Sequence, residues 1–385
     1  MPSNYEIHLK SARESLKVLR KFLYMNNGSV GPLPTETIEA VLQEQENELL
    51  NGRIGAEAFL RKRTIKDQTR KAVAGLINAT PEEVTLTQNT TEGINIVISG
   101  INWQKGDEVI TTDVEHGAVL LPLFLIAKRY GVHFIIAKAE KNLVQSIREQ
   151  ITGKTKLIVL SHVSYSTGAI LPLHDIINLA HARDIPVLID GAQSAGAISV
   201  DVRELEVDYY SLPGQKWLLG PEGTGALFIR KDRLDELGQT FIGYSSVEQF
   251  SSEGEFISHT GAERFEVASI NVPNLAGQKA SIRWLTEKVG WEVIFQYSNQ
   301  LAEAARRDLG KISGVTVITP SKAAGLVSFR VSGVEPAKVV ALLANQGIII
   351  RAIKELSAVR ASIAFYNTEE ELERFLKAVT GLAGS

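Results

Sequence analysis

Two side chains near the middle of the chain have the chemistry and the setting to hold an aldehyde cofactor. Lys216 lies in a turn-rich segment, and Asp190, 26 residues before it, ends the apolar run 187–189. A lysine amine can form an imine with an aldehyde, and a carboxylate at the end of a buried strand can keep a pyridine nitrogen protonated. Pyridoxal phosphate (PLP) needs both groups, because its protonated ring accepts electrons from a substrate carbanion. The pair therefore predicts a PLP site.

Each of these residues also has a simpler interpretation. Most lysines in turns lie at the surface, and an acid after a strand often caps the next helix. The apolar Trp217 and the leucines after it favour a lysine in a pocket, where the pKa of the amine falls and the amine becomes nucleophilic. Next to Asp190, Ala192 could pack on the ring face and Gln193 could reach the ring hydroxyl. The pair at this spacing is more specific than either residue alone.

Two further segments could complete such a site. Thr90 and Thr91 follow the apolar run 84–86 and begin a predicted helix, where hydroxyl and free backbone N–H groups can bind a phosphate. The same residues are also typical of a capped helix N-terminus, and a capped helix can still bind a phosphate. His116 follows the run 109–112 and could stack on an aromatic cofactor, although a lone histidine is more often structural.

The elements that must position these residues alternate between strands and helices. Short apolar or β-branched runs predict strands at 84–86, 108–111, 134–136, 157–160, 186–189 and 226–229. Helix-like segments lie between them at 91–101, 118–130, 143–151 and 173–183. This alternation is typical of an α/β fold with a mainly parallel sheet, in which ligands bind at the carboxyl ends of the strands. Asp190 lies at such an end.

The pattern changes after about residue 254. A long helical stretch is predicted from 274 to 309, and helices are predicted at 336–346 and 368–382. Strand-like runs lie between them at 315–318, 326–331, 348–350 and 359–364. This part of the chain is therefore predicted to form a separate α+β unit.

Composition excludes several classes of protein. With 385 residues and a net charge of −3, the chain is expected to form two domains and to lack a general nucleic-acid-binding surface. It has no cysteine, which excludes disulfides, thiolate metal sites and cysteine nucleophiles. Its histidines are scattered without His-x-x-x-His spacing, so no metal site is expected. Without a signal-like start or a long apolar run, we predict a cytoplasmic enzyme that does not bind membranes.

Taken in chain order, these motifs resemble the class V aminotransferase superfamily of PLP enzymes, which includes cysteine desulfurases, isopenicillin N epimerase and kynureninase. The resemblance covers nearly the whole chain and is carried by segments 27–32, 90–92, 115–116, 190–194, 215–217, 264–266 and 360–362. Segments 207–210, 264–268 and 326–329 are most similar to the cyanobacterial-type cystine C–S lyases.

The resemblance implies fold type I, with a large domain built on a mainly parallel seven-stranded sheet flanked by helices and a smaller α+β C-terminal domain. The expected limits are 1–20 for an N-terminal helical segment, 21–255 for the large PLP-binding domain and 256–385 for the small domain.

The resemblance also implies a role for each matching residue. Lys216 would form the Schiff base and act as the catalytic base, Asp190 would hold the pyridine nitrogen, and His116 would stack on the ring. The other residues expected to contact the cofactor are Thr90, Thr91, Ala192, Gln193 and Gln215. The family usually has histidine at Gln215 and serine or threonine at Pro213, so the phosphate ligands differ here.

For the substrate, the resemblance implies a small amino acid whose carboxylate is bound by Arg360, with Asn27 close by. A guanidinium suits this task because its two-pronged donors fit a carboxylate. Ser269 would reach the phosphate of the neighbouring subunit, which implies a homodimer with shared active sites.

The expected reaction follows from the resemblance and from the missing cysteine. Cysteine desulfurases use a cysteine to attack the substrate sulfur, and this chain has none. A β-elimination from cystine, cysteine or a related amino acid needs no such residue and would give pyruvate, ammonia and a sulfur product. Transamination and epimerisation are equally compatible with the missing cysteine. A relative that keeps the fold but only binds a partner is a further alternative.

Overall fold

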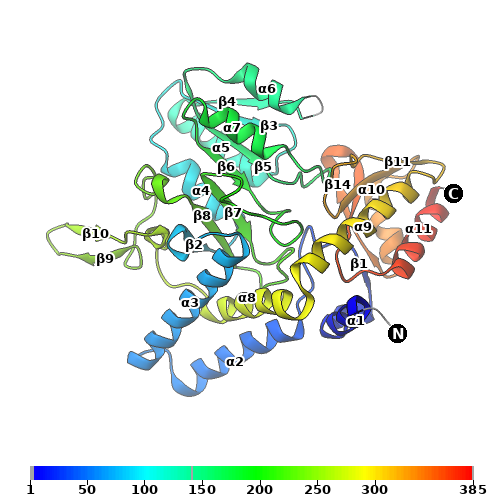
Figure 1. The fold of residues 1–385 in the computed structure, drawn as a ribbon, viewed down its shortest axis with the longest axis horizontal. Helices are drawn as coiled ribbons and strands as arrows, with labels where there is room; N and C mark the ends of the chain where they lie inside the picture. The colour runs from blue at the N-terminus through cyan, green and yellow to red at the C-terminus, as the bar shows by residue number, and fades with distance from the viewer. Residues whose placement is uncertain (1–3, 140–141, 384–385) are drawn as a thin grey trace.

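The computed structural model describes residues 4–139 and 142–383. Residues 1–3 and 384–385, which the predicted first and last domains include, lie outside this description. Within the described residues, seven strands form one sheet in the order β2-β8-β7-β6-β5-β3-β4 (Figure 1). They are β2 (Val84–Thr87), β3 (Glu108–Thr112), β4 (His133–Ala137), β5 (Thr155–Ser161), β6 (Val187–Asp190), β7 (Tyr209–Pro213) and β8 (Gly225–Ile229).

The sheet is mainly parallel, as predicted. Only β8 runs antiparallel to its neighbours, β2 and β7, and the pairings among the other strands are parallel. Asp190 is the last residue of β6 and is paired with Ser161, the last residue of β5. The carboxyl ends of the two central strands therefore lie side by side.

Helices cover both faces of this sheet. One face packs against α6 (Leu143–Gln150), α7 (Leu173–His181) and the end of α3 (Ala56–Leu76). The other face packs against α4 (Thr90–Gly100) and α5 (Gly117–Tyr130). Successive strand residues point to opposite faces, so Ile158 lies in the first core and Val159 in the second. Burial on both sides explains why the central strands are apolar throughout.

A second, four-stranded antiparallel sheet has the order β11-β12-β15-β14. Its strands are β11 (Val315–Val317), β12 (Leu326–Val331), β14 (Arg351–Ile353) and β15 (Ala358–Ser362). It shares a core with α9 (Trp291–Leu309), α10 (Pro336–Ala344) and α11 (Glu369–Ala383). This α+β unit lies to one side of the large sheet in Figure 1.

An early segment of the chain also joins this unit. β1 (Leu23–Tyr24) pairs in parallel with β13 (Ile348–Ile349), and the side chain of Met25 is buried in the same core. An isolated bridge between Asn26 and Ser362 continues the contact. Residues 23–26 therefore pack with the C-terminal sheet, although they are distant from it in sequence.

The remaining elements link the two units. α1 (Asn4–Ser15) begins the described chain, and α2 (Thr35–Asn51) and α3 pack against α8 (Val272–Trp284). The predicted continuous helix 274–309 is interrupted, because a π-helical turn (Leu285–Val289) follows α8 and Gly290, with φ of +90°, separates it from α9. A hairpin of β9 (Val247–Phe250) and β10 (Phe256–Ser258) projects from the body (Figure 1).

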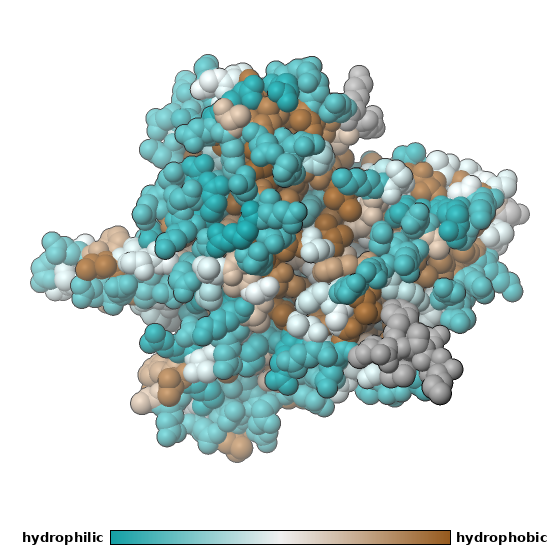
Figure 2. Space-filling model, viewed as in Figure 1, coloured by the Kyte–Doolittle hydropathy of each residue, from teal (hydrophilic) through white to brown (hydrophobic). Residues whose placement is uncertain are grey.

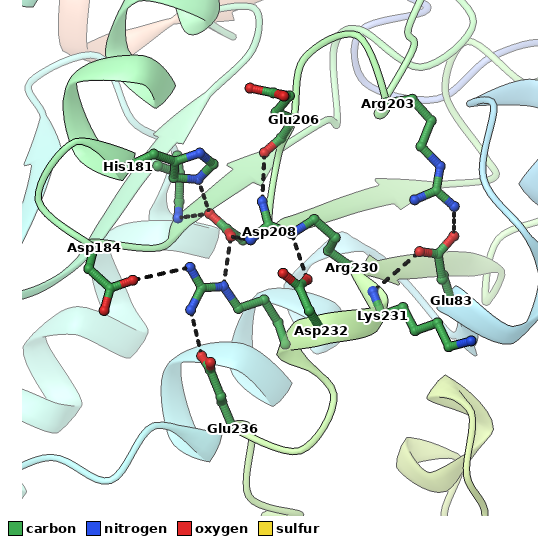
Figure 3. Close-up of polar contacts among 12 residues, drawn as sticks. Glu83, His181, Asp184, Arg203, Glu206, Asp208, Arg230, Lys231, Asp232 and Glu236 are labelled. Atoms are coloured by element: carbon green, nitrogen blue, oxygen red, sulfur yellow. Dashed lines mark hydrogen bonds and ion pairs between the residues drawn. The ribbon is translucent and has the colours of Figure 1, made fainter.

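A buried carboxylate ties together the end of the large sheet that is opposite Asp190. Asp208 comes just before β7, and its oxygens lie 2.7 Å from the backbone N of Val187 and 2.9 Å from His181 Nε2. Arg230 Nη2 and Arg233 Nε also lie 2.9 Å from Oδ1 (Figure 3). The Asp208 carboxylate therefore has a structural role: its ion pairs and hydrogen bonds join β6, β7, β8 and the end of α7.

None of the described helices has the length and apolarity needed to cross a membrane.

Candidate active site

A cavity of about 220 Å³ lies at the carboxyl ends of the central strands and is closed on one side by the second sheet. The N-terminal turns of α4 and α5 and residues 28–29 also line it. It collects predicted site residues that are up to 270 positions apart in the chain. Those that line it are Thr90, Thr91, His116, Asp190, Ala192, Gln193, Gln215, Lys216 and Arg360.

Asp190 is fixed at the tip of β6 with its carboxylate facing this cavity. Its side chain is buried, and Oδ1 accepts a hydrogen bond from the backbone N–H of Ala192 at 2.8 Å. Burial raises the pKa of Asp190, whereas the nearby Lys216 lowers it. The next residue must be glycine for steric reasons, because a Cβ at Gly191 would collide with the ring of Tyr210. An acid in this position favours a cationic partner in the cavity.

Lys216 lies in the loop that follows β7. Burial lowers the pKa of its amine to about 8, although the charge of Asp190 opposes the shift, and Arg360 and Arg351 lower it further. The neutral form of the amine, which can attack an aldehyde, is therefore much more populated near physiological pH than it is for an ordinary lysine. Trp217 and Leu218, which follow Lys216 in the chain, are buried, whereas the cavity that Lys216 lines is formed mainly by polar residues.

The lysine loop is held from both sides. The N–H of Gly31 donates to the carbonyl of Gln215 at 2.7 Å, and the N–H of Gly214 donates to the carbonyl of Thr224 at 2.8 Å. Gly214 lies so close to the Gln278 side chain of α8 that a Cβ would collide with it. Because Gly31 and Gly214 have no side chains, the segment around residue 31 and α8 can both pack directly against the loop that carries Lys216.

His116 is both the N-cap of α5 and a wall of the cavity. Its Nδ1 accepts a hydrogen bond from the N–H of Ala118 at 3.1 Å, which places the ring proton on Nε2. The ring meets Tyr165 edge-on at a centroid distance of 4.9 Å. Burial, with the charge of Lys216, lowers the pKa of His116, so the ring is neutral at physiological pH. A neutral ring suits stacking on an aromatic ligand.

The start of α4 provides an anion site at the other end of the cavity. Thr90 and Thr91 are its first two residues, and the first N–H groups of a helix have no partner within the helix. The Asn89 side chain satisfies the N–H of Glu92 at 2.9 Å, which leaves the N–H groups before it for a ligand. Gln215 Oε1 has no hydrogen-bond partner in the described part of the chain.

Arg360 is presented from β15 of the second sheet. Its side chain is fully buried, and Nη1 donates to the carbonyl of Tyr165 at 2.5 Å. Its Nε and Nη2 atoms find no hydrogen-bond partner among residues 4–139 and 142–383. Burial, with the charge of Arg351, lowers the pKa of Arg360 to about 9. Buried guanidinium N–H groups without partners are costly, so this pair of donors fits a carboxylate ligand.

Two predicted site residues lie outside this group. Asn27 is buried behind the cavity, where its Oδ1 accepts from Tyr366 Oη at 2.7 Å. Ser269 lines a different hollow near Gly223 and Asn274, and its Oγ lies 2.7 Å from Tyr244 Oη. Their expected roles at the substrate and at a neighbouring subunit's phosphate stay predictions.

The structure also adds residues that sequence patterns did not indicate. Arg351 of β14 lines the cavity, and its Nη1 donates to Ser29 Oγ at 3.2 Å. Tyr165 lines it as well, in a loop without a regular pattern. Arg351 belongs to a strand of only three residues, so no periodic signal marks it.

The donor set fits PLP on the geometry of this chain. The cavity offers an amine with a lowered pKa, an acid with one hydrogen bond, a helix start for a phosphate and a buried guanidinium whose Nε and Nη2 have no partner in the described part of the chain. If PLP binds, Lys216 would hold its aldehyde, Asp190 its ring nitrogen, and Thr90 and Thr91 its phosphate.

Comparisons with known proteins agree with this assignment. The Aminotransferase class-V family model matches residues 23–375. A probable cysteine desulfurase of Methanothermobacter thermautotrophicus is 30% identical over 395 residues, covering 97% of this chain and 98% of that protein.

Two solved structures of the protein C-DES match with a TM-score of 0.92 and 32% sequence identity. One is a mutant with glycine covalently linked to the PLP cofactor, and the match covers 96% of this chain and 99% of that one. The other is a complex of the cystine C–S lyase C-DES with its reaction product cysteine persulfide, covering 95% and 99%.

These structures confirm the predicted fold type I architecture, in which a mainly parallel sheet and a smaller α+β unit enclose the site. The chain belongs to the class-V aminotransferase family, in agreement with the resemblance seen in its sequence.

Proposed function

We propose that this protein is a PLP-dependent lyase that cleaves the Cβ–S bond of a small sulfur amino acid such as cystine. The observation that carries the proposal is the shared cavity of Lys216, Asp190 and Arg360. The buried amine and acid suit the cofactor, and the unpaired guanidinium suits an amino-acid carboxylate. The similarity to C-DES over nearly the whole chain favours sulfur amino acids over other substrates.

Arg360, Lys216 and Asp190 have separate roles in the proposed reaction, according to where each lies in the cavity. When bound, PLP supplies an aldehyde that links to an amine and a ring that accepts an electron pair. Arg360 orients the substrate by its carboxylate, with the Cα–H bond towards Lys216. With PLP bound, the neutral form of the Lys216 amine would remove the Cα proton, and Asp190 would hold positive charge at the ring nitrogen.

The absence of cysteine from the chain decides how sulfur leaves. No side-chain thiol can take sulfur from the substrate, so the sulfur departs from Cβ with the bonding electron pair. For cystine and one water, the products are pyruvate, ammonia and cysteine persulfide, and all atoms are conserved. The reaction should therefore resist thiol-alkylating reagents.

Arg351 favours a substrate with a second carboxylate. Its guanidinium lies in the same cavity as Arg360 but is exposed at the mouth. Cystine carries one carboxylate at each end of the molecule, whereas cysteine carries one. We therefore assign the near carboxylate to Arg360 and the distal carboxylate to Arg351.

We also propose that the protein works as a homodimer. Large apolar side chains are exposed on the projecting hairpin, where Figure 2 shows an apolar patch, and include Phe250 and Phe256. Phe241 is exposed as well, and so is Tyr244, whose Oη contacts Ser269 Oγ. Large exposed apolar groups of this kind mark interfaces. Light scattering should give twice the chain mass, and a monomer with full activity would contradict this proposal.

The function is tested by incubating PLP-loaded protein with cystine, cysteine and alanine without a keto acid. Repeated turnover of cystine to pyruvate supports elimination. A single turnover that ends at pyridoxamine phosphate would indicate transamination, and a change of optical rotation alone would indicate epimerisation. Protein that takes up no PLP would indicate a binding protein instead. The cytoplasmic location stays a prediction from the sequence.

A further inference from the structure

A buried acid beside the cavity has no part in the chemistry proposed above. Glu115 lies in the turn between β3 and α5, directly before His116, and its side chain is only 5% exposed. No basic side chain in the described part of the chain forms an ion pair with it. A buried carboxylate is costly unless hydrogen bonds satisfy it, so its partners indicate why it is tolerated.

Three donors converge on this carboxylate. Oε1 accepts from Thr112 Oγ1 at 2.5 Å and from the backbone N–H of Ser161 at 3.1 Å, and Oε2 accepts from Ser161 Oγ at 2.6 Å. Thr112 ends β3 and Ser161 ends β5. Glu115 therefore holds its own turn against the carboxyl ends of two adjacent strands.

The two ends of this connection are residues of the cofactor site. On one side the backbone continues directly into His116, whose ring walls the cavity. On the other side, Ser161 lines the cavity and is the register partner of Asp190 in β6. A shift of Glu115 would change the position of the His116 ring relative to the Asp190 carboxylate, although Glu115 itself does not line the cavity.

We propose that Glu115 is a positioning residue that fixes the His116 ring and the Asp190 carboxylate relative to each other, so that both can contact PLP. This inference rests on the proposed PLP-dependent function. Burial raises the pKa of Glu115 to about 7, opposed by hydrogen bonds from Ser161 and Thr112, and Asp190 raises it slightly further. At metal sites, removing a partner that orients a ligating residue usually changes affinity by about tenfold or more, and we expect a loss of similar size here.

The test compares Glu115→Ala and Glu115→Gln with Asp113→Asn as a matched control. Asp113 is an acid of the same turn, but its carboxylate accepts from Ala139 N at 2.9 Å and pairs with Lys138. The measurements are the dissociation constant of PLP from the apoprotein and the visible circular dichroism of bound PLP, which reports how the ring is oriented.

Glu115→Ala should weaken PLP binding about tenfold and reduce the visible dichroism. Glu115→Gln should recover most of both, because an amide oxygen still accepts from Thr112 and from the Ser161 N–H. Asp113→Asn should match the wild type. If Glu115→Ala does not fold, Ser161→Ala removes one of the three hydrogen bonds and should cause a smaller loss in the same direction.

Unchanged affinity and dichroism in Glu115→Ala, or in Ser161→Ala if the former does not fold, would overturn the inference even if the melting temperature falls. An equal loss in Asp113→Asn would also overturn it, because any change in the turn would then suffice. Wild-type protein that does not bind PLP would instead refute the proposed function, so the two failures are distinguishable.

Discussion

A Cβ atom at Gly28 would lie 2.6 Å from Nη2 of Arg360 and 2.9 Å from Oγ of Ser362. Gly28 therefore leaves the room that the guanidinium occupies, and a side chain at this position would have to displace the ends of the Arg360 and Ser362 side chains of β15.

Gly28→Ala should displace the Arg360 guanidinium and raise the KM for amino-acid substrates about tenfold, equal to about 1.4 kcal/mol of binding. PLP affinity should change little, because the cofactor contacts lie on other elements. Gly75→Ala is the control, since nothing lies within 4 Å of its Cβ position in α3. A KM that stays at the wild-type value would contradict the expected displacement of the guanidinium from the substrate carboxylate.

The rate at which apoprotein reacts with PLP should rise with pH through a midpoint near 8 and then level off, because the protonated Lys216 amine cannot attack an aldehyde. Stopped-flow absorbance measures this rate, and Lys216→Ala should show no such reaction. A midpoint near 10 would indicate an ordinary exposed lysine.

The same shift affects stability. The pKa of Lys216 is lower in the folded apoprotein than in the unfolded chain, so between about 8 and 10.5 the unfolded chain binds more protons. The contribution of Lys216 to the free energy of unfolding should therefore rise with pH across this window. Lys216→Met, which cannot be protonated, should lack this rise in denaturant titrations.

Arg351→Ala should raise the KM for cystine about tenfold, because a charge-assisted hydrogen bond to the distal carboxylate is lost. The KM for S-ethylcysteine, which has one carboxylate, should stay the same and serves as the control within one variant. Equal losses for both substrates would place Arg351 at the near carboxylate or in a structural role.

Asp208→Asn should lower the free energy of unfolding by about 3 kcal/mol, since Arg230 and Arg233 would lose the buried charge between them. Asp232→Asn removes an exposed partner of Arg230 and should cost less than about 1 kcal/mol. Denaturant titration measures both. PLP affinity should be unaffected, because Asp208 lies at the opposite end of the sheet from Asp190; a loss of affinity would contradict this separation.

Much of the site could be predicted because its residues follow strong local signals. Asp190 ends a run of apolar residues, and Thr90 begins a helix after another such run, so both are placed at the same edge of a parallel sheet. The strands that were predicted are buried on both faces, which gives them a continuous apolar sequence.

The parts that were not predicted depend on long-range packing. β7 contains Ser211 and ends at Pro213, so it has no strand pattern, and it is held by β6 and β8 on its two sides. Arg351 is placed by a three-residue strand paired with β15. The contact of Glu115 with Ser161 joins residues 46 positions apart, and no local rule relates them.

The pairing of β1 with β13, and of Asn26 with Ser362, has a consequence for how the protein matures during synthesis. The strands of the large sheet lie within residues 84–229, so this sheet can form while the ribosome is still translating the C-terminal part of the chain. The wall of the cavity that carries Arg360 needs residues 26–29 and the segment up to Ser362 together. A nascent chain can thus form the sheet that carries Asp190 before it forms the wall that carries Arg360.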